Sequence, residues 1–135
     1  MRIFLVENHP ATLACVRRHL ERRGHEVETA ETVADTLRAL PARPCDLLIA
    51  DLGLPDGDGW TLLEDLGPAR PPLALAMSGW GDAADEARSR AAGFQQHLTK
   101  PFLPDELDRV LSRLEWSAGE ANEGMSRAVP GGEKS

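Results

Sequence analysis

Short apolar runs alternate with amphipathic stretches along this chain. Between the runs, apolar residues recur at helical spacing, which is typical of repeated strand and helix units and of a parallel sheet. The pattern predicts a doubly wound α/β fold with five parallel strands in the order 2-1-3-4-5 and helices on both faces. The expected strands fall at residues 3–6, 25–29, 47–50, 73–77 and 94–98.

Two of the expected helices carry distinct patterns. Between residues 82 and 93 the inward candidates are alanines, which bury much less apolar area than leucines, so we expect this helix to be loosely anchored. The last helix repeats large apolar residues at i, i+3, i+4 and i+7, the spacing of a core-facing stripe. The alanines are Ala84, Ala87 and Ala91, and the apolar residues of the last helix are Leu107, Val110, Leu111 and Leu114.

The composition fits one folded domain followed by a tail. The chain has 135 residues, 41% of them hydrophobic, enough for one compact core. From residue 117 to 135 the sequence turns to Gly, Glu, Ser and Asn, which bury too little apolar area to offset the entropy of ordering. We therefore predict a domain at 1–116 and a disordered tail at 117–135.

The charge balance bears on partners and location. The net charge of -7, from 22 acidic and 15 basic side chains, opposes both nucleic acid phosphates and anionic membranes. The apolar run at the amino terminus is too short for a secretion signal, and no run is long enough to cross a bilayer. The sequence predicts a soluble, cytoplasmic protein without nucleic acid or membrane partners. Cys15 and Cys45 have no metal-ligand spacing and are interpreted as buried free thiols.

Polar residues that could bind a ligand or react with it follow the ends of the predicted strands. Glu7 and Asn8 follow the first strand, Asp51 the third, Ser78 the fourth and Lys100 the fifth. Because the carboxyl ends of parallel strands converge on one crevice in such sheets, these residues are expected to share one site. Carboxylate oxygens suit Mg²⁺, which binds one or two carboxylates together with phosphoryl oxygens. The arrangement therefore predicts phosphate chemistry.

The same residues resemble the receiver domain of two-component response regulators, over residues 1 to about 116. The resemblance rests on four motifs, which are Glu7-Asn8, Asp51 followed by Leu54-Pro55-Asp56-Gly57-Asp58-Gly59, Ser78-Gly79, and Lys100-Pro101-Phe102. It implies a flavodoxin-like fold and a single-domain, chemotaxis-regulator-like protein. The chain is also short enough to be a fragment of a larger hybrid protein.

The resemblance implies a role for each of these positions. Asp51 would be the phosphoacceptor, Ser78 would hydrogen-bond the phosphoryl group, and Lys100 would pair with it. Mg²⁺ would be the cofactor, and the peptide bond before Pro101 would be cis. The metal set implied for Mg²⁺ is Glu7, Asn8, Asp51 and the backbone carbonyl of Gly53. Asp56 and Asp58 are interpreted instead as turn formers and as a cap for the third helix.

The implied function is two-component signal transduction. The donor would be a sensor histidine kinase or a histidine phosphotransfer protein, and phosphorylation would switch the surface that binds an unknown downstream protein. The chain would act as a stoichiometric phosphoacceptor that assists its own phosphorylation and dephosphorylation, not as an enzyme, and as a monomer or weak homodimer. The alternative is a receiver-like binding module that works without phosphorylation because of Asn8.

Three positions carry alternative interpretations. Asn8 stands where the family usually has a metal-binding aspartate, and it offers only a neutral oxygen; alternatively it organises the start of the first helix. His97 replaces the usual aromatic switch residue and adds a group that titrates near neutral pH, or it is an exposed edge residue without function. Trp80 is a lid on the rim of the site, or it packs on the edge of the core.

Overall fold

The computed structural model describes residues 1–79 and 83–126. The chain divides into two units, Met1–Phe102 and Leu103–Ser135, and each is considered by itself. The first unit contains the whole sheet and every residue of the predicted site.

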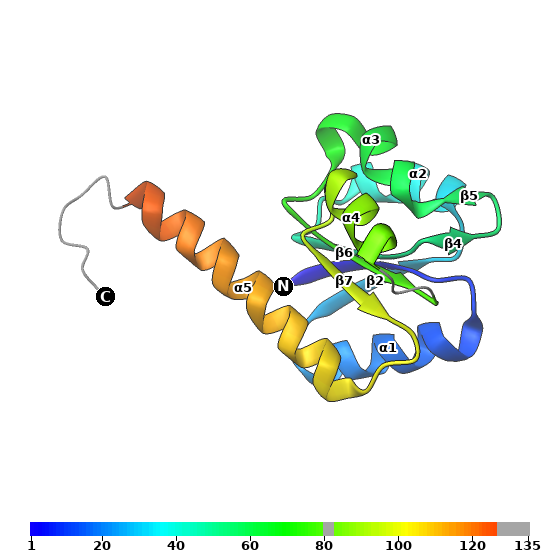
Figure 1. Cartoon of the computed structure of the whole chain (residues 1–135), viewed down its shortest axis with the longest axis horizontal. Helices are drawn as coiled ribbons and strands as arrows, with labels where there is room; N and C mark the ends of the chain where they lie inside the picture. Colours follow the sequence, from blue (N-terminus) through cyan, green and yellow to red (C-terminus); the bar gives the residue numbers. More distant parts are fainter. Residues whose placement is uncertain (80–82, 127–135) are drawn as a thin grey trace. The chain divides into compact units, whose positions relative to one another are not determined.

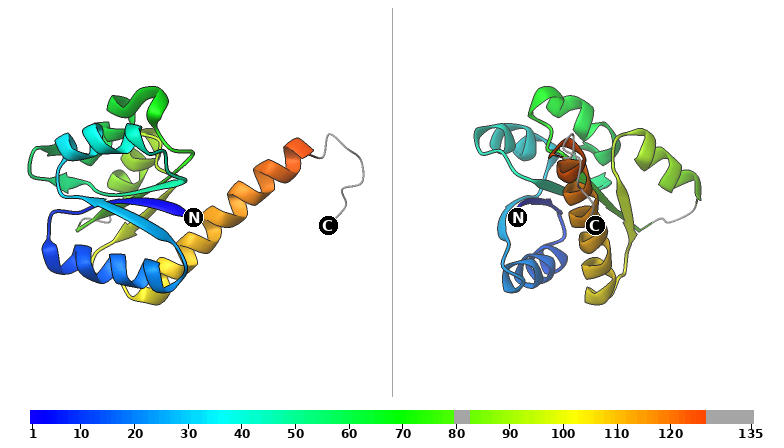
Figure 2. Two further views of the ribbon diagram at one scale, coloured as in Figure 1. Left: turned by 180° about the vertical axis from the view of Figure 1, so that it is seen from behind. Right: turned by 90° about the vertical axis from the view of Figure 1, so that its left-hand side faces the viewer.

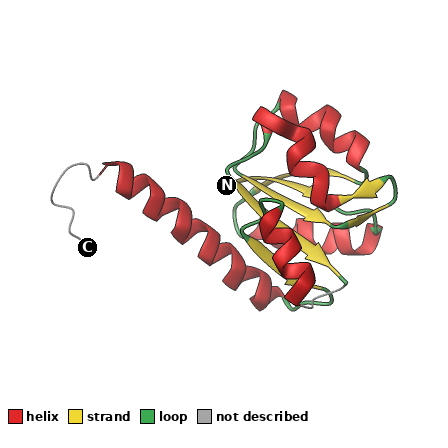
Figure 3. Ribbon diagram, turned by 45° about the horizontal axis from the view of Figure 1, so that its top comes forward, coloured by secondary structure: helices red, strands yellow, loops and turns green. Residues whose placement is uncertain are grey.

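A five-stranded parallel sheet forms the centre of the first unit (Figures 1 and 3). The strand order is β2-β1-β3-β6-β7, which is 2-1-3-4-5 when the five strands are counted along the chain. The predicted fold class and strand order are therefore confirmed. The strands are β1 (Arg2–Val6), β2 (Glu26–Ala30), β3 (Leu47–Asp51), β6 (Leu73–Ser78) and β7 (Gln96–Thr99).

Burial explains the positions of the strands in this order. All residues of β3 and β6 are buried, as expected for central strands that are covered on both faces. Strand β2 alternates polar and apolar residues and lies at one edge, where fewer apolar contacts are available. Strand β2, which has few apolar residues, thus lies at the edge of the sheet, and the buried strands β3 and β6 lie in its interior.

Helices cover both faces of this sheet. Helix α1 lies on one face, and α2, α3 and α4 lie on the other (Figures 1 and 2). Within the described residues, no helix has the length and apolar content needed to cross a bilayer. The α-helices of this unit are α1 (Pro10–Arg22), α2 (Val33–Ala39), α3 (Leu62–Leu66) and α4 (Ala83–Ala91), with 3₁₀ turns η1 (Leu40–Ala42), η2 (Gly59–Thr61) and η3 (Gly67–Ala69).

The helix starts follow the sequence signals. Pro10 occupies the first turn of α1, where its missing N–H costs no hydrogen bond. The hydroxyl of Thr32 accepts a hydrogen bond of 3.0 Å from the Asp35 N–H and so caps α2. The Asp58 carboxylate accepts 3.1 Å from the Thr61 N–H and caps η2, which precedes α3. Asp58, one of the two residues predicted to form turns or cap the third helix, thus caps the 3₁₀ turn that leads into this helix.

A small antiparallel hairpin, formed by β4 (Gly53–Leu54) and β5 (Gly57–Asp58), follows β3. The sequence predicted turn-forming residues here, Asp56 and Asp58, but not the two short strands. Leu54 is buried in the hydrophobic core, so the hairpin is anchored to the body of the unit rather than projecting from it. We refer to residues 53–58 as the β4–β5 hairpin.

Helix α4 is attached differently from the prediction. Ala87 and Ala91, expected to face inward, are exposed, and the side chain of Ala84 lies outside the described residues. Ser89 is buried instead, and its hydroxyl accepts a 3.1 Å hydrogen bond from the Trp60 indole N–H. The Arg88 guanidinium stacks 3.8 Å from the centre of the same indole ring. Polar and aromatic contacts thus hold a helix that lacks large apolar residues.

The second unit contains one helix, α5 (Pro104–Ser126). It continues beyond the predicted domain boundary at 116, so residues 117–126 are helical where a disordered tail was predicted. Ala118, Glu120, Ala121, Glu123 and Met125 have high helix propensity, and extending a helix needs no new nucleation. The remainder of the predicted tail, residues 127–135, lies outside the described residues.

Gly59 allows close packing between the β4–β5 hairpin and β3, and we expect Gly59→Ala to destabilise the protein. A Cβ atom there would lie 2.8 Å from the Asp51 carbonyl oxygen and 2.9 Å from Leu52 Cα, both backbone atoms that cannot move independently. The expected loss is about 1–3 kcal/mol of unfolding free energy, measured by urea denaturation. Gly79→Ala is the control, because a Cβ at Gly79 meets no atom within 4 Å. Equal effects of the two substitutions would contradict this packing argument.

Candidate functional site

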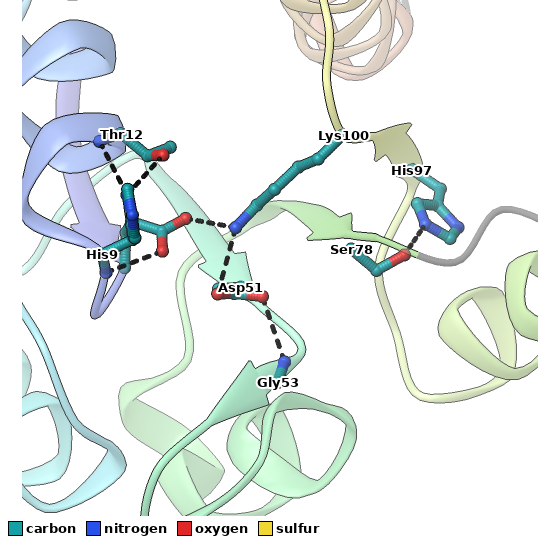
Figure 4. A network of polar contacts seen from close by, with 8 residues as sticks. His9, Thr12, Asp51, Gly53, Ser78, His97 and Lys100 are labelled. Atoms are coloured by element: carbon teal, nitrogen blue, oxygen red, sulfur yellow. Dashed lines mark hydrogen bonds and ion pairs between the residues drawn. The ribbon is translucent and has the colours of Figure 1, made fainter.

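The predicted site residues come together at the carboxyl ends of the strands. Asp51 is the last residue of β3 and Ser78 the last of β6, while Glu7 directly follows β1 and Lys100 directly follows β7. Figure 4 shows Lys100 reaching across toward Asp51, with Ser78 on the neighbouring strand. The Lys100–Pro101 peptide bond is cis, as expected from the resemblance.

Lys100 joins two carboxylates. Its Nζ donates to Glu7 Oε1 at 2.6 Å and to Asp51 Oδ2 at 3.1 Å (Figure 4). Glu7 is fully buried and Asp51 is 7% exposed, so neither carboxylate is solvated as it would be in the unfolded chain. Two buried like charges repel strongly in a medium of low dielectric, and the ammonium group between them offsets this repulsion. The charged groups of Glu7 and Asp51 thus both contact that of Lys100 at the carboxyl ends of the strands.

Backbone amides bind the remaining carboxylate oxygens. The His9 N–H donates to Glu7 Oε2 at 3.0 Å, and the Gly53 N–H donates to Asp51 Oδ1 at 3.0 Å. Each carboxylate thus has one oxygen on Lys100 and one on a backbone N–H. This fixes the orientation of both groups, and it places Asp51 directly beside the β4–β5 hairpin.

The Lys100 ammonium stays charged in this setting. Desolvation lowers the pKa of Lys100, but the hydrogen bonds and negative charges of Glu7 and Asp51 outweigh it and raise the pKa above its usual 10.5. Lys100 therefore carries its full positive charge at neutral pH. A permanent cation beside Asp51 favours the binding of a phosphoryl group there.

Ser78 and His97 form a second polar pair on neighbouring strands. Ser78 Oγ lies 2.8 Å from His97 Nε2 (Figure 4), and Ser78 is fully buried. His97 itself is half-buried, and its Nδ1 is buried without a hydrogen-bond partner among the described residues. His97 does lie on the edge strand β7, but it is half-buried and not exposed, and its ring contacts the predicted phosphoryl-binding hydroxyl.

For two further residues of the predicted site, Asn8 and Trp80, the described residues show no contact that supports the predicted roles. Asn8 is exposed, and the side chain that caps α1 belongs to His9, whose Nδ1 accepts 3.4 Å from the Thr12 N–H. The capping role that was considered for Asn8 thus falls to its neighbour. Trp80 lies outside the described residues, so the structure does not address either interpretation of it.

The donor set fits Mg²⁺ in a limited way. No group of three His, Cys, Asp or Glu side chains suited to a metal ion occurs in the described ranges. Glu7 and Asp51 do converge, since both lie within 3.1 Å of the same nitrogen. Mg²⁺ usually binds one or two carboxylates plus phosphate oxygens, so the residues present fit this ion best when a phosphoryl group completes the set.

Sequence reasoning missed two contributors to the site. One is the His9 N–H, which orients Glu7, and the other is Asp56, whose carboxylate accepts from the Val33 and Ala34 N–H groups at 2.8 and 3.0 Å. Asp56 lies in a turn, as predicted, but the helix that its carboxylate caps is α2 and not the third helix. Nothing in the local sequence marks this contact, because the partners lie 22 and 23 residues away.

Comparison with known families decides the identity of this fold and site. The family model described as the response regulator receiver domain matches residues 3–112. The chain belongs to this receiver family. The four motifs noted in the sequence all lie in the matched range, which confirms the resemblance on which their interpretation rested.

Curated relatives of this receiver domain are named as transcriptional regulators. The chain is 36% identical over 112 residues to the transcriptional regulatory protein KdpE of Mycobacterium tuberculosis, a match covering 83% of the chain and 48% of that protein. It is 35% identical over 109 residues to the KDP operon transcriptional regulatory protein KdpE of Escherichia coli, covering 81% and 48%. The chain spans about half the length of these relatives, so their activity as whole proteins does not transfer to it directly.

Solved receiver structures share the fold. A CheY-like receiver domain protein from Methanospirillum hungatei JF-1 is 30% identical with a TM-score of 0.78, and the match covers 88% of this chain and 97% of that one. The receiver domain of the sensor histidine kinase PA1611 from Pseudomonas aeruginosa PAO1 is 25% identical with a TM-score of 0.74, covering 84% and 95%. That structure holds a magnesium ion coordinated in its active site cleft.

Proposed function

We propose that this receiver domain accepts a phosphoryl group on Asp51 from a sensor histidine kinase or a histidine phosphotransfer protein. The observation that supports this most is the convergence of Asp51 and the buried Glu7 on Lys100 Nζ at the strand ends. Such a site combines a nucleophilic carboxylate with a fixed cation for the incoming phosphoryl oxygens. The domain that carries it is residues 1–116.

In the proposed reaction, an Asp51 carboxylate oxygen attacks the phosphorus of a phosphohistidine in line with the departing nitrogen. The new O–P bond forms as the P–N bond breaks. The electron pair of the broken P–N bond stays on the donor imidazole, which takes a proton from solvent. The Lys100 ammonium neutralises charge on the phosphoryl oxygens, and the Gly53 N–H holds the second Asp51 oxygen in place.

Bound Mg²⁺ would neutralise further charge on the phosphoryl group. Glu7, Asp51 and the Gly53 backbone carbonyl would hold it, and Asn8 would contribute at most a neutral amide oxygen. Support for this cofactor comes from the donor chemistry of the chain and from the magnesium ion in the related receiver of Pseudomonas aeruginosa.

The switch would start at Ser78. A phosphoryl group adds about two negative charges and three acceptor oxygens. It would therefore compete with His97 for the Ser78 hydroxyl, which lies 2.8 Å from the His97 ring. A shift of His97 would alter the surface near α4 and β7 and so change binding of a downstream protein.

The wider biological setting is also part of the proposal. The protein would be cytoplasmic, a monomer or weak homodimer, and a stoichiometric phosphoacceptor that assists its own phosphorylation and dephosphorylation. The names of the two KdpE relatives leave direct contact with nucleic acid open for a longer protein that contains such a domain. Nothing in the comparisons favours the alternative of a binding module that acts without phosphorylation.

Incubation with Mg²⁺ and acetyl phosphate, followed by intact mass spectrometry, tests the proposed function. We expect a mass increase of one phosphoryl group that requires the metal and disappears under EDTA. Peptide mapping would place it on Asp51. A protein that never gains this mass under these conditions would contradict the proposal and favour the binding module.

Asn8 gives a second prediction, on the metal. We expect Asn8→Asp to tighten Mg²⁺ binding by about tenfold, because a third carboxylate raises the charge of the ligand set. Isothermal titration calorimetry with Mg²⁺ alone measures this directly. Asn8→Ala is the neutral control, which removes the amide oxygen and should bind Mg²⁺ no more tightly than the wild type. Equal affinities for Asn8→Asp and the wild type would exclude Asn8 from the metal set.

A further inference from the structure

Asp56 lies at the tip of the β4–β5 hairpin and connects it to the start of α2. Its two carboxylate oxygens accept hydrogen bonds from the N–H groups of Val33 and Ala34, the first two residues of α2. These bonds lower the pKa of Asp56 below its usual 3.8, so the carboxylate is charged at neutral pH. The contact is intramolecular and joins two elements that are distant in the sequence.

The base of the same hairpin touches the phosphoacceptor. Gly53 pairs with Asp58 across the hairpin, and the Gly53 N–H donates to Asp51 Oδ1 at 3.0 Å. The Gly59 N–H donates to the Leu52 carbonyl at 2.9 Å and closes the hairpin against β3. The hairpin is therefore tied to β3 at its base and to α2 at its tip.

The fit between the hairpin and α2 is close. A Cβ atom on Gly57 would lie 3.5 Å from Val33 Cγ2, so the backbone of β5 approaches the first residue of α2. Leu54 and Val33 belong to the same apolar core. The hydrogen bonds of Asp56 thus add to this packing and join the hairpin tip to α2.

We infer that Asp56 is a positioning residue for phosphoryl transfer at Asp51. This inference rests on the proposed function of Asp51 as phosphoacceptor. By fastening the hairpin tip to α2, Asp56 keeps the Gly53 N–H on Asp51 Oδ1 and keeps the Gly53 carbonyl where the proposed metal set requires it. Misplacement of such groups by about 1 Å can cost on the order of a hundredfold in rate.

The chain offers a matched control for helix stability. The N–H groups of the first three residues of α2 are divided between two caps, because Asp56 accepts from Val33 and Ala34 while Thr32 accepts from Asp35. Thr32→Ala weakens the start of α2 without touching the hairpin contact to Asp56. Asp56→Ala weakens the same helix start and also releases the hairpin. The comparison separates helix stability from positioning.

The first measurement is the rate of Asp51 phosphorylation by acetyl phosphate with Mg²⁺, followed by intact mass. We expect Asp56→Ala to slow it by about tenfold or more, Thr32→Ala to change it less than about twofold, and Asp56→Asn to fall between, since its amide oxygen keeps one acceptor. The Asn variant also serves if Asp56→Ala does not fold. Equal slowing by Asp56→Ala and Thr32→Ala would overturn the inference.

The second measurement needs no phosphorylation. Amide hydrogen exchange at Gly53 in the metal-free protein should accelerate in Asp56→Ala and stay unchanged in Thr32→Ala, because only the first releases the hairpin. Unchanged exchange at Gly53 in Asp56→Ala would overturn the inference even if the rate fell. If the wild type is not phosphorylated at all, the proposed function fails, and this exchange result alone decides whether Asp56 holds the hairpin.

Discussion

Replacing Asp51 with asparagine is expected to abolish phosphoryl uptake. The neutral amide is a poor nucleophile and cannot form the acyl phosphate, although it retains the shape of the side chain and an oxygen that can accept from Gly53 or Lys100. After incubation with Mg²⁺ and acetyl phosphate, intact mass spectrometry should show no added phosphoryl group on Asp51→Asn. The wild type should show one.

Asp46→Asn is the matched control for this prediction. Asp46 is an exposed carboxylate just before the opposite end of the same strand, where it accepts from the Arg2 N–H. The control makes the same chemical change and should leave phosphoryl uptake at the wild-type level. A normal mass gain in Asp51→Asn would show that another residue accepts the phosphoryl group. A loss in Asp46→Asn would show that the assay reports damage to the fold.

The strand pattern allowed most of the sheet to be predicted, for physical reasons. Residues 47–50 and 73–77 are apolar without interruption, as strands covered on both faces require, and residues 25–29 alternate, as an edge strand does. Together with the helical spacing between them, these runs define five parallel strands and restrict their order. Strand ends were less accurate, since the fifth strand spans Gln96–Thr99 instead of residues 94–98.

Hydrogen bonds that side chains make between different helices and strands could not be predicted from the sequence in the same way. Helix α4 lacks large apolar residues and is held by the hydrogen bond between Trp60 and Ser89, which are 29 residues apart and have no local sequence signature. The Asp56 contact to α2 is of the same kind. Hydrophobic periodicity indicates which apolar residues are buried, but it does not indicate which polar groups will form hydrogen bonds with each other.

The convergence of strand ends in a parallel sheet predicted which residues form the site, but not which of them form hydrogen bonds and ion pairs with each other. Glu7, Asp51 and Lys100 were expected in one place, yet the prediction gave Lys100 a phosphoryl partner. The structure pairs it with both carboxylates, one of them 93 residues away. Likewise, the side-chain pairing of Ser78 with His97 depends on the register of β6 and β7, which the sequence does not specify.

Lys100→Met is expected to lower both stability and phosphoryl uptake. Removing the ammonium leaves the fully buried Glu7 and the nearly buried Asp51 as unpaired like charges. An unsatisfied buried charge costs about 1–3 kcal/mol or more, so the unfolding free energy at pH 7 should fall by that amount. Loss of a fixed donor to the phosphoryl group should slow Asp51 phosphorylation by about a hundredfold or more.

The pH dependence of this stability difference has a definite sign. Because Glu7 and Asp51 raise the pKa of Lys100, the ion pairs stabilise the fold fully below the ordinary pKa of 10.5 and lose their effect as the pH rises through the higher folded value. Urea denaturation of the wild type and Lys100→Met should therefore differ by a constant amount near neutral pH. Above about pH 10.5 the difference should shrink.

A double substitution separates the two roles of Lys100. Adding Glu7→Gln to Lys100→Met removes the unpaired buried charge, and the Gln side chain can still accept from the His9 N–H. The double variant should therefore recover most of the lost unfolding free energy. It should not recover phosphorylation, because the cation that faces Asp51 is still missing and the Glu7 carboxylate of the proposed metal set is now missing as well. If Lys100→Met alone were as stable as the wild type at pH 7, the ion pairs would contribute nothing measurable. If the double variant regained the wild-type phosphorylation rate, Lys100 would act only by neutralising Glu7.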